Sequence, residues 1–241
     1  GDIYQVSLSQ QFVARSRLSS QKLYQRLRRL NPTHFSAYLD GGEFQVLSSS
    51  PERFLCVEGD RVLTRPMKGT RPRHPDTGKD VMLERQLLAS AKDKAELTMI
   101  VDLERNDLGR VCNYDSVKVL RLRQLEKYRT VFQTTATVEG RLHKHKDRID
   151  LLRACFPGGS ITGCPKIRAM EIIEELEPSR RCIYTGALGY LSFSGNMDLN
   201  ILIRTILKKD DRLYFGAGGG IVADSNPEAE YKETLVKAEA I

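Results

Sequence analysis

The order of strand-like and helix-like segments limits the folds open to this chain. Runs with strand character are grouped near the start, the middle and the end of the sequence, and helix-like runs are grouped between them. Strict alternation of strand and helix would indicate a parallel sheet with crossover helices, and this pattern is absent. We therefore expect an α+β fold with layered, mainly antiparallel β-sheets and helices packed outside them.

The expected elements follow from hydrophobic periodicity and from turn residues. The expected strands are 2–8, 34–39, 43–49, 53–58, 60–64, 116–125, 130–139, 186–194, 197–208 and 212–217. The expected helices run from Ser19 or Ser20 to Leu30, over 78–109 without a break, over 147–155, from about Pro165 and from about Pro227. The four short strands between 34 and 64 are joined by "DGG" and "EGD" turns, so we predict a meander there.

Length and composition favour one globular domain over the whole chain. The 241 residues are 40% hydrophobic, which is enough for a sizeable core, and no repeat, low-complexity stretch or linker divides residues 1–241. No apolar run has the length of a membrane span, and the start lacks the features of a signal peptide. We expect a soluble, cytoplasmic protein. Because the first residue is Gly1 in a strand-like run and not Met, we expect a preceding part of the protein to be missing.

The cysteines and the net charge exclude several classes of function. The 5 cysteines are widely spaced without a CxxC pair, so they indicate reduced thiols and neither disulfides nor a zinc site. The net charge of +7 is compatible with a nucleic acid or with a small polyanion. The lysines and arginines are scattered without an aromatic stripe, so we expect no nucleic-acid partner.

A pair of carboxylates near the end of the chain is the first candidate site. In "PEAEYKETLVK", Glu230 and Glu233 are three residues apart and Lys237 follows Glu233 by four, so all three share a helix face. The glycine-rich run "GAGGGIVADSNP" precedes them and allows a ligand to approach the backbone. This arrangement suits Mg²⁺, and the alternative is a solvated face with one ion pair.

Two other acids and two glycine-rich loops are further candidates. Glu96 lies in an apolar helical segment and is a possible third ligand, and Glu52 follows a proline between two strands, where a structural turn carboxylate is the alternative. "FPGGSITGCPK" is not a phosphate loop, because Pro165 comes between Gly163 and Lys166. "GAGGGI" does not fit GxGxxG, so nucleotide binding is disfavoured.

Taken in order along the chain, eight segments resemble the chorismate-utilising enzymes, a family that includes aminodeoxychorismate, anthranilate, isochorismate and salicylate synthases. These segments are "GDIYQVSLSQQF", "SSSPERF", "RPMKGTRPR", "KAELTMIVDLERNDLGRV", "FPGGSITGCPKIRAMEIIEELEP", "TGALGYLSF", "NILIRTI" and "GAGGGIVADSNPEAEYKET". The resemblance spans nearly the whole chain. It implies that residues 1–241 are the chorismate-binding catalytic domain and that the N-terminal part typical of the family is absent.

Two positions discriminate among the reactions of this family. Members that add water to the ring carry a lysine where this chain has Gln5, and an amide cannot take a proton from water. The segment "PMKGT" resembles the "PIKGT" of the aminodeoxychorismate branch more than the "PIAGT" of anthranilate synthases. The resemblance therefore implies that Lys68 is a covalent nucleophile. We expect the nearby cations Arg65, Arg71 and Arg73 to favour its neutral, reactive form.

The resemblance implies a Mg²⁺-dependent amination of chorismate at C4. Glu96, Glu230 and Glu233 hold the metal on the ring carboxylate, Lys68 attacks C2, and Glu52 protonates the departing 4-hydroxyl as a general acid. Ammonia then adds at C4 and Lys68 leaves, which gives 4-amino-4-deoxychorismate on the route to p-aminobenzoate and folate.

The resemblance also implies a set of substrate contacts. These are Tyr184, Arg204 and Lys237 for the enolpyruvyl carboxylate, backbone donors at Gly218 and Gly219, and the hydroxyl of Thr162. Arg204 lies in the apolar run "NILIRTILK", which we expect to be one buried strand, and a structural salt bridge is the alternative role. Gln133 replaces a histidine of the family and cannot shuttle a proton, which disfavours elimination of pyruvate.

The family resemblance implies a partner that supplies ammonia. This partner is a glutamine amidotransferase, either a separate subunit or a fused domain, because none of the five cysteines lies in a GxCxG elbow. The alternatives are the large component of anthranilate synthase and an inactive chorismate-binding module. We expect chorismate and ammonia as ligands, and no membrane partner.

Overall fold

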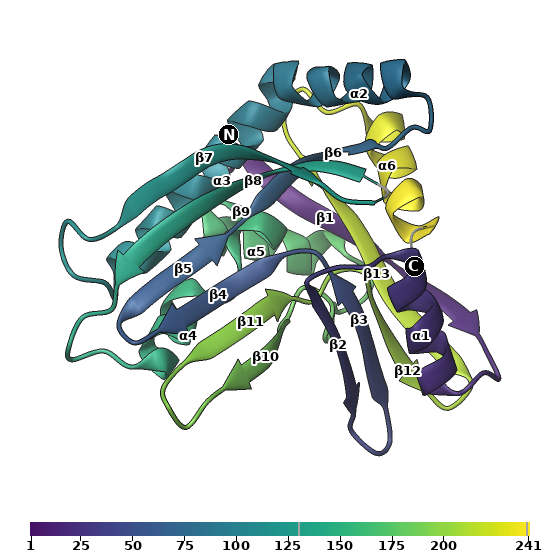
Figure 1. Cartoon of the computed structure of the whole chain (residues 1–241), viewed down its shortest axis with the longest axis horizontal. Helices are drawn as coiled ribbons and strands as arrows, with labels where there is room; N and C mark the ends of the chain where they lie inside the picture. The colour runs from purple at the N-terminus through teal and green to yellow at the C-terminus, as the bar shows by residue number, and fades with distance from the viewer. Residues whose placement is uncertain (130, 240) are drawn as a thin grey trace. The chain divides into compact units, whose positions relative to one another are not determined.

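A computed structural model describes residues 1–129, 131–239 and 241 of the chain (Figure 1). These residues form two compact units, each assembled from separate stretches of sequence. The first unit consists of Gly1–Glu52, Ile161–Gly189 and Leu199–Ile241, and the second of Arg53–Ser160 and Tyr190–Asp198.

The first unit is built on a six-stranded sheet with the order β2-β3-β12-β13-β1-β9. Its strands are β1 (Gln5–Arg15), β2 (Phe35–Asp40), β3 (Gln45–Ser50), β9 (Gly163–Cys164), β12 (Thr205–Lys209) and β13 (Arg212–Ile221). Its helices are α1 (Ser20–Leu30), α5 (Lys166–Leu176) and α6 (Pro227–Glu239). Strands β1 and β13 form a long antiparallel pair from Val6 opposite Ile221 to Arg15 opposite Arg212, and this pair supports the candidate site.

The core of the first unit forms where helices cover this sheet. The buried Leu27 of α1 packs against Leu47, Ile206 and Leu213, all of them strand residues. As predicted, a serine begins the helix, because Ser19 accepts a hydrogen bond from the main-chain N–H of Lys22. Alternation along the strands directs these apolar side chains to the helical face.

The second unit contains strands of a seven-stranded sheet with the order β10-β11-β4-β5-β8-β6, in which β7 also pairs with β8. The strands are β4 (Arg53–Glu58), β5 (Arg61–Arg65), β6 (Met67–Pro72), β7 (Lys118–Lys127), β8 (Val131–Arg141), β10 (Ala187–Leu191) and β11 (Met197–Ile201). The helices are α2 (Thr77–Ala89), α3 (Ala91–Gly109) and α4 (Arg148–Cys155), with a short 3₁₀ turn at Gly159–Ile161.

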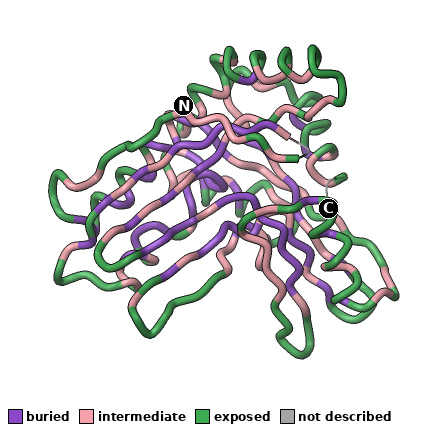
Figure 2. The backbone as a smooth tube through the Cα atoms, viewed as in Figure 1, coloured by how far each residue is buried: buried purple, intermediate pink, exposed green. Residues whose placement is uncertain are grey.

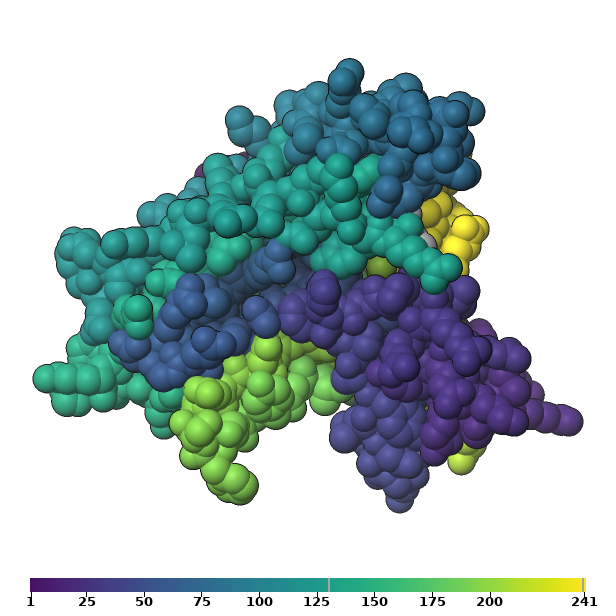
Figure 3. All heavy atoms as spheres, viewed as in Figure 1, coloured from purple at the N-terminus to yellow at the C-terminus, as the bar shows by residue number. Residues whose placement is uncertain are grey.

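Figure 2 shows that the buried backbone of the second unit follows β4, β5 and β8. Phe132 of β8 is fully buried, and the guanidinium of Arg73 lies 4.6 Å from the centre of its ring. Helix α2 lies beside the strand segments of β7 and β8 on the face shown in Figure 3. No helix among the described residues has the length and apolar character needed to cross a membrane.

The expected fold class is confirmed, since the structure has two mainly antiparallel sheets with helices outside them. The predicted meander is wrong, because β2 and β3 pair in one sheet whereas β4 and β5 pair in the other. The prediction also missed β6, whose sequence contains "MKGTRP". Strand β6 lies at the end of its sheet, where a proline is tolerated because no ladder hydrogen bond is lost on the open side.

Two elements expected to be continuous are broken. The helix predicted over 78–109 is two helices, because Ser90 adopts an extended conformation between α2 and α3. The strand predicted over 197–208 is also two strands, because Arg204 has φ +48° and interrupts the extended backbone. Thr130, the first residue of the predicted strand 130–139, lies outside the described residues, and β8 begins at Val131.

Candidate active site

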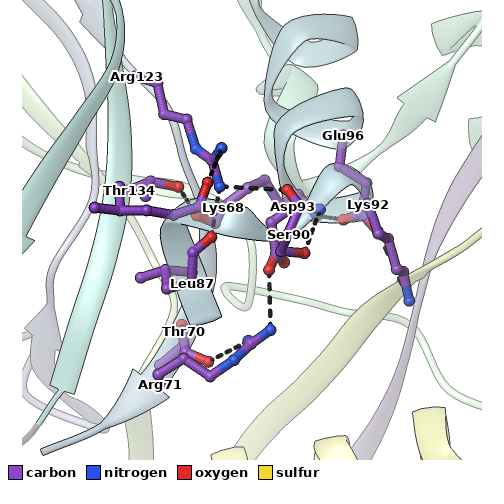
Figure 4. A network of polar contacts seen from close by, with 11 residues as sticks. Lys68, Thr70, Arg71, Leu87, Ser90, Lys92, Asp93, Glu96, Arg123 and Thr134 are labelled. Carbon is purple, nitrogen blue, oxygen red and sulfur yellow. Dashed lines mark hydrogen bonds and ion pairs between the residues drawn. The ribbon is translucent and has the colours of Figure 1, made fainter. Parts of the chain in front are cut away.

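Lys68 lies in β6 of the second unit, and its main chain is held closely (Figure 4). The hydroxyl of Thr134 on β8 donates to the Lys68 carbonyl at 2.5 Å. The next residue, Gly69, has φ +75°, and a Cβ there would lie 2.8 Å from Leu87 Cδ1 and 2.9 Å from Asp93 Cγ. Only glycine fits this position without strain, so packing fixes the backbone from which the Lys68 side chain starts.

The amine of Lys68 faces a carboxylate of α3. Its Nζ lies 3.8 Å from Glu96 Oε2, and the two side chains are only 15% and 12% exposed. A second amine, Lys92 Nζ, lies 3.8 Å from Glu96 Oε1, although Lys92 is more exposed. Both distances are those of ion pairs and exceed hydrogen-bond length. The structure therefore brings together two residues that the sequence placed in the site, Lys68 and Glu96.

The arginines near Lys68 in the sequence do not surround it with unbalanced positive charge. Arg65 pairs with Glu126, Arg71 pairs with Asp93 at 3.2 Å, and Arg73 pairs with Asp80 at 2.8 Å. A carboxylate therefore compensates each guanidinium, and the expectation that these cations favour a neutral Lys68 stays a prediction. The bond from Arg73 is also the main reason why the pKa of Asp80 lies below its usual value.

Gln133, at the position of the family histidine, lies in the second unit near Lys68. It is 5% exposed, and its Nε2 donates to Thr70 Oγ1 at 3.3 Å across the β6–β8 pair. Its Oε1 is buried without a hydrogen-bond partner among the described residues. Burying an amide oxygen without a partner costs free energy, so this atom is a candidate contact for a ligand donor.

In the first unit, Glu230, Glu233 and Lys237 gather over Gly219, as their spacing predicted. A Cβ on Gly219 would lie 3.5 Å from Glu230 Oε2, 3.8 Å from Glu233 Oε1 and 3.9 Å from Lys237 Nζ. Lys237 pairs with Glu233 at 2.6 Å, and the Oγ of Ser225 donates to Glu230 Oε1 at 2.7 Å. The absent side chain of Gly219 leaves room for charged groups above the strand.

The two predicted backbone donors differ in direction. Lys237 Nζ donates to the Gly218 carbonyl at 2.9 Å, on the edge of β13 that faces away from β1. The N–H of Ser9, opposite Gly218, also points away from this pair, because it donates to Glu177 at 2.8 Å. Ser9 and Gly218 are therefore a pair without mutual hydrogen bonds. In an antiparallel ladder the two kinds of pair alternate, so Leu8 and Gly219 are hydrogen-bonded to each other. The N–H of Gly219 is therefore directed at β1, and Gly218 is the better candidate donor to a ligand.

Gln5 and Thr162 lie close together at the start of β1. Gln5 is 2% exposed, and its Oε1 has no hydrogen-bond partner among the described residues. Thr162 is equally buried, and its carbonyl accepts from the N–H of Ser7 at 2.7 Å. The glycine-rich loop that was compared with a phosphate loop thus adds the short strand β9 to the sheet, with Cys164 opposite Gln5.

Glu52 is 4% exposed, so it is not a surface turn residue. Its N–H donates to Ser50 Oγ at 3.2 Å, and its carbonyl accepts from the N–H of Ile201 at 3.1 Å. These bonds fix the backbone on both sides of Pro51 and keep the carboxyl group in the interior.

Tyr184 and Arg204 lie elsewhere in the first unit. The ring of Tyr184 rests on Gly216, where a Cβ would lie 2.6 Å from its Cδ1. Burial raises the pKa of the Tyr184 phenol, so the hydroxyl stays protonated at neutral pH. Because residues 216 and 219 of a strand point to opposite faces, this ring and the Glu230 cluster are on different sides of β13. Arg204 lies in the break before β12, where its carbonyl accepts from the N–H of Ser49 at 3.0 Å.

The donor groups for a metal are divided between the units. No group of three or more His, Cys, Asp or Glu side chains suited to a metal occurs within the part of the chain that the structure describes. Glu230 and Glu233 supply two carboxylates on one helix face, and Glu96 belongs to the second unit. Two carboxylates above a glycine fit Mg²⁺, which usually takes one or two protein carboxylates and completes its shell with water and ligand oxygens.

Other residues that hold Lys68 and Glu96 in place are less evident from the sequence. Lys92 is four residues before Glu96 on the same helix, so the i, i+4 rule could have found it. Asp93 contacts the Lys68 segment at Gly69 and Arg71 only through the tertiary fold, and no local pattern marks it.

The chain belongs to the family of chorismate binding enzymes, whose pattern it matches over residues 1–241. The resemblance inferred from the eight sequence segments is thereby confirmed.

Among the individual relatives, two synthases and one solved structure are informative. The chain is 51% identical over 241 residues to aminodeoxychorismate synthase component 1 of Klebsiella aerogenes, covering 100% of this chain and 53% of that protein. It is 47% identical over 242 residues to anthranilate synthase component 1 of Streptomyces coelicolor, covering 100% of this chain and 47% of that protein. The crystal structure of anthranilate synthase component I from Streptococcus pneumoniae TIGR4 superposes with a TM-score of 0.90 at 41% identity, covering 99% of this chain and 53% of that one.

The chain spans about half the length of these relatives. Relatives named for two different products are similarly close, so overall identity separates chorismate chemistry from other chemistries but does not choose between the two products. That choice depends on individual side chains.

Proposed function

We propose that this chain aminates chorismate at C4 with ammonia and forms 4-amino-4-deoxychorismate. The observation that carries the proposal is the placement of Lys68 in a chain of this family, with its amine 3.8 Å from Glu96 and both side chains largely buried. A lysine in this position would be an unusual choice for a surface cation, because partial burial of a charge costs free energy. A role as nucleophile accounts for it.

In this proposal, Lys68 and Glu52 carry out the first half of the reaction. The Lys68 nitrogen bonds to C2, the ring double bonds shift, and the C4–O bond breaks while Glu52 donates a proton so that water leaves. Ammonia then bonds to C4, the double bonds shift back, and the C2–N bond breaks to release Lys68. Two allylic steps replace one direct substitution at C4.

Other side chains of the chain set the outcome of the reaction. Gln5 offers an amide oxygen in place of a base, so it cannot activate water as a competing nucleophile. Gln133 cannot carry a proton to or from the ring, which supports retention of the enolpyruvyl group in the product. The proposed contacts for substrate oxygens are Arg204, Lys237, Thr162 and the N–H of Gly218. The N–H of Gly219 is directed at β1 and Tyr184 lies on the other side of β13 from Lys237, so we do not include them in this set.

Magnesium is the proposed cofactor. Glu230 and Glu233, which share a helix face above Gly219, would hold it, and when bound it would withdraw electron density from the ring through the ring carboxylate. We propose that ammonia comes from a glutamine amidotransferase, as a subunit or a fused domain. We place the reaction in the cytoplasm, on the route to p-aminobenzoate and folate.

The test is to incubate the chain with chorismate, magnesium and ammonium, and to identify the product by mass spectrometry. We expect a product that keeps the enolpyruvyl group. Lys68→Ala should reduce its formation by at least roughly 100-fold, since covalent catalysis is lost. Lys94→Ala removes an exposed lysine of α3 and should retain the wild-type rate. An undiminished rate in Lys68→Ala would show that the covalent role is wrong.

The second candidate function is that of an anthranilate synthase large component, and the 47% identity to such a protein favours it. The two functions differ in the carbon that is aminated and in the fate of the side chain, because anthranilate formation places nitrogen at C2 and releases pyruvate, whereas the first proposal places nitrogen at C4 and keeps the enolpyruvyl group. A lactate dehydrogenase assay on the same reaction detects pyruvate, and pyruvate formed in step with chorismate loss would favour this second function. Chorismate binding without any turnover would favour an inactive chorismate-binding module.

A further inference from the structure

Arg123 of β7 donates to main-chain oxygens at the break between α2 and α3 (Figure 4). Its Nη2 lies 2.6 Å from the Leu87 carbonyl and 3.4 Å from the Ser90 carbonyl, and its Nη1 lies 2.8 Å from the Leu88 carbonyl. The last carbonyls of a helix have no partner within the helix and carry partial negative charge. A guanidinium is well suited to satisfy several of them at once.

The contacts of Arg123 differ from those of most other arginines in the second unit. Arg53, Arg61 and Arg73 each pair with a carboxylate, whereas Arg123 has no ion pair with a carboxylate among the described residues. Its Nε is buried without a hydrogen-bond partner among those residues. The charge of Arg123 is therefore directed entirely at the helix break.

The break lies directly against the Lys68 segment. Leu87 is fully buried, and its Cδ1 would be 2.8 Å from a Cβ on Gly69, the residue after Lys68. The carbonyl that accepts from Arg123 and the methyl group that packs on Gly69 thus belong to the same residue. A shift of Leu87 would act on the backbone from which Lys68 projects.

The break also sets the position of Glu96. The Oγ of Ser90 accepts from the N–H of Asp93 at 3.2 Å and so begins α3, and Asp93 pairs with Arg71 of β6. Glu96 follows Asp93 by three residues on the same helix face, where it lies 3.8 Å from Lys68 Nζ. The first turn of α3 is therefore fixed from the same point that Arg123 holds.

We infer that Arg123 is a positioning residue, which braces the break between α2 and α3 and thereby holds Glu96 opposite Lys68. This inference rests on the proposed function, in which Lys68 and Glu96 act on chorismate. Arg123 acts through the backbone at 87–90 and does not itself contact the two side chains.

The experiment compares wild type with Arg123→Ala by hydrogen exchange and by steady-state kinetics with chorismate, magnesium and ammonium. Without the guanidinium, the amide of Asp93 should exchange at least about tenfold faster, because the cap at Ser90 loosens. The kcat should fall roughly 10- to 100-fold, as expected for a small misplacement of reacting groups. The KM for chorismate should change by less than about threefold. Millimolar guanidinium should restore part of kcat, and Arg123→Lys should lie between the two.

Arg148→Ala is the matched control. Arg148 is in the same unit and also donates to main-chain oxygens, those of Gly195 at 2.7 Å and Gly59 at 2.7 Å, but it lies on α4. Its loss should destabilise the protein to a similar degree. It should change neither the exchange of the Asp93 amide nor kcat.

The outcomes separate this inference from the proposed function. If Arg123→Ala keeps both the protection of Asp93 and the wild-type kcat, or if Arg148→Ala loses as much activity, the inference is overturned. If Lys68→Ala remains active while Arg123→Ala shows faster exchange of the Asp93 amide and a lower kcat, the covalent role of Lys68 is wrong and the positioning role of Arg123 is supported. If the chain makes no product at all, hydrogen exchange at the Asp93 amide alone tests the inference. Unchanged protection in Arg123→Ala overturns the positioning role of Arg123, and faster exchange supports it.

Discussion

At the scale of single residues, strand β6 fixes the position of Lys68, and helix α3 supplies the charged group that its amine faces. Its carbonyl is bonded to Thr134, Gly69 next to it tolerates no side chain, and its amine faces Glu96. In the proposed reaction, the amine of Lys68 has to leave this ion pair in order to bond to C2.

The buried thiol of Cys112 gives a pH-dependence that is testable at this scale. Desolvation raises its pKa from 9.0 to about 11, and its Sγ would lie 2.7 Å from a Cβ on Gly140. The thiol ionises in the unfolded chain above pH 9 but stays neutral in the folded chain until about pH 11. The stabilisation is therefore complete below pH 9 and is lost as pH rises to 11. We expect the free energy of unfolding to fall by about 2 kcal/mol over this window.

Denaturant unfolding between pH 8.5 and 11 checks this expectation, with Cys112→Ala and Cys182→Ala as the two variants. Cys112→Ala should flatten the fall in stability, whereas the exposed Cys182 should be replaceable without effect on its slope. An identical slope in wild type and Cys112→Ala would contradict the assignment to this thiol.

Local spacing predicted some residues of the site and failed for others. Glu230, Glu233 and Lys237 could be placed on one helix face because 3.6 residues complete a turn, and the glycine before them indicated where they would point. The partners of the arginines around Lys68 could not be predicted, because Glu126 is brought to Arg65 only by the fold. A run of cations in a sequence therefore does not predict the electrostatic potential at the residue between them.

At the scale of elements, the break at Ser90 is the feature that sequence patterns could not reveal. The apolar residues of 78–109 keep a helical period across it, so a single helix was the reasonable prediction. The break depends on contacts from β7 and β6, which are remote in the sequence. Strand β6 was missed for a related reason, since Pro72 within it and Pro66 before it argue against a strand unless its place at the sheet edge is known.

The N-cap at Ser90 should affect both the stability of the protein and its activity. Ser90→Ala removes the acceptor for the Asp93 N–H, and Ser19→Ala removes the acceptor for the Lys22 N–H of α1. Each variant should lose about 1 kcal/mol of stability in urea, the usual value for an N-cap. Only Ser90→Ala should also slow product formation, because it alone loosens the helix that carries Glu96. Equal losses of activity in the two variants would count against this view.

At the scale of the whole molecule, the α+β class and most elements were predictable, but the assignment of strands to sheets was not. The lengths and turns of 34–64 fitted a meander, and only the structure shows that β3 and β4 belong to different sheets. Sheet membership is decided by pairs distant in sequence, such as β3 with β12. Such pairs leave no local signal in a single sequence.

The distribution of the cysteines over the folded chain predicts an order of alkylation. Cys182 is exposed and Cys164 is partly buried with a raised pKa, whereas Cys56, Cys112 and Cys155 are buried. Iodoacetamide should modify Cys182 first and Cys164 slowly, because the thiolate is the reactive form. The three buried thiols should react only after denaturation. Peptide mass spectrometry after timed labelling checks the order, and early modification of Cys112 would contradict it.

The pairing of β1 with β13 has a consequence for biosynthesis. Val6 leaves the ribosome long before Ile221, the residue it lies opposite in the sheet. During translation β1 therefore has apolar side chains and open backbone groups without the neighbour that later covers one of its edges. Nascent chains with such delayed pairing fold slowly and expose unpaired, aggregation-prone strand edges. We therefore expect this chain to bind chaperones until its last strands have been synthesised.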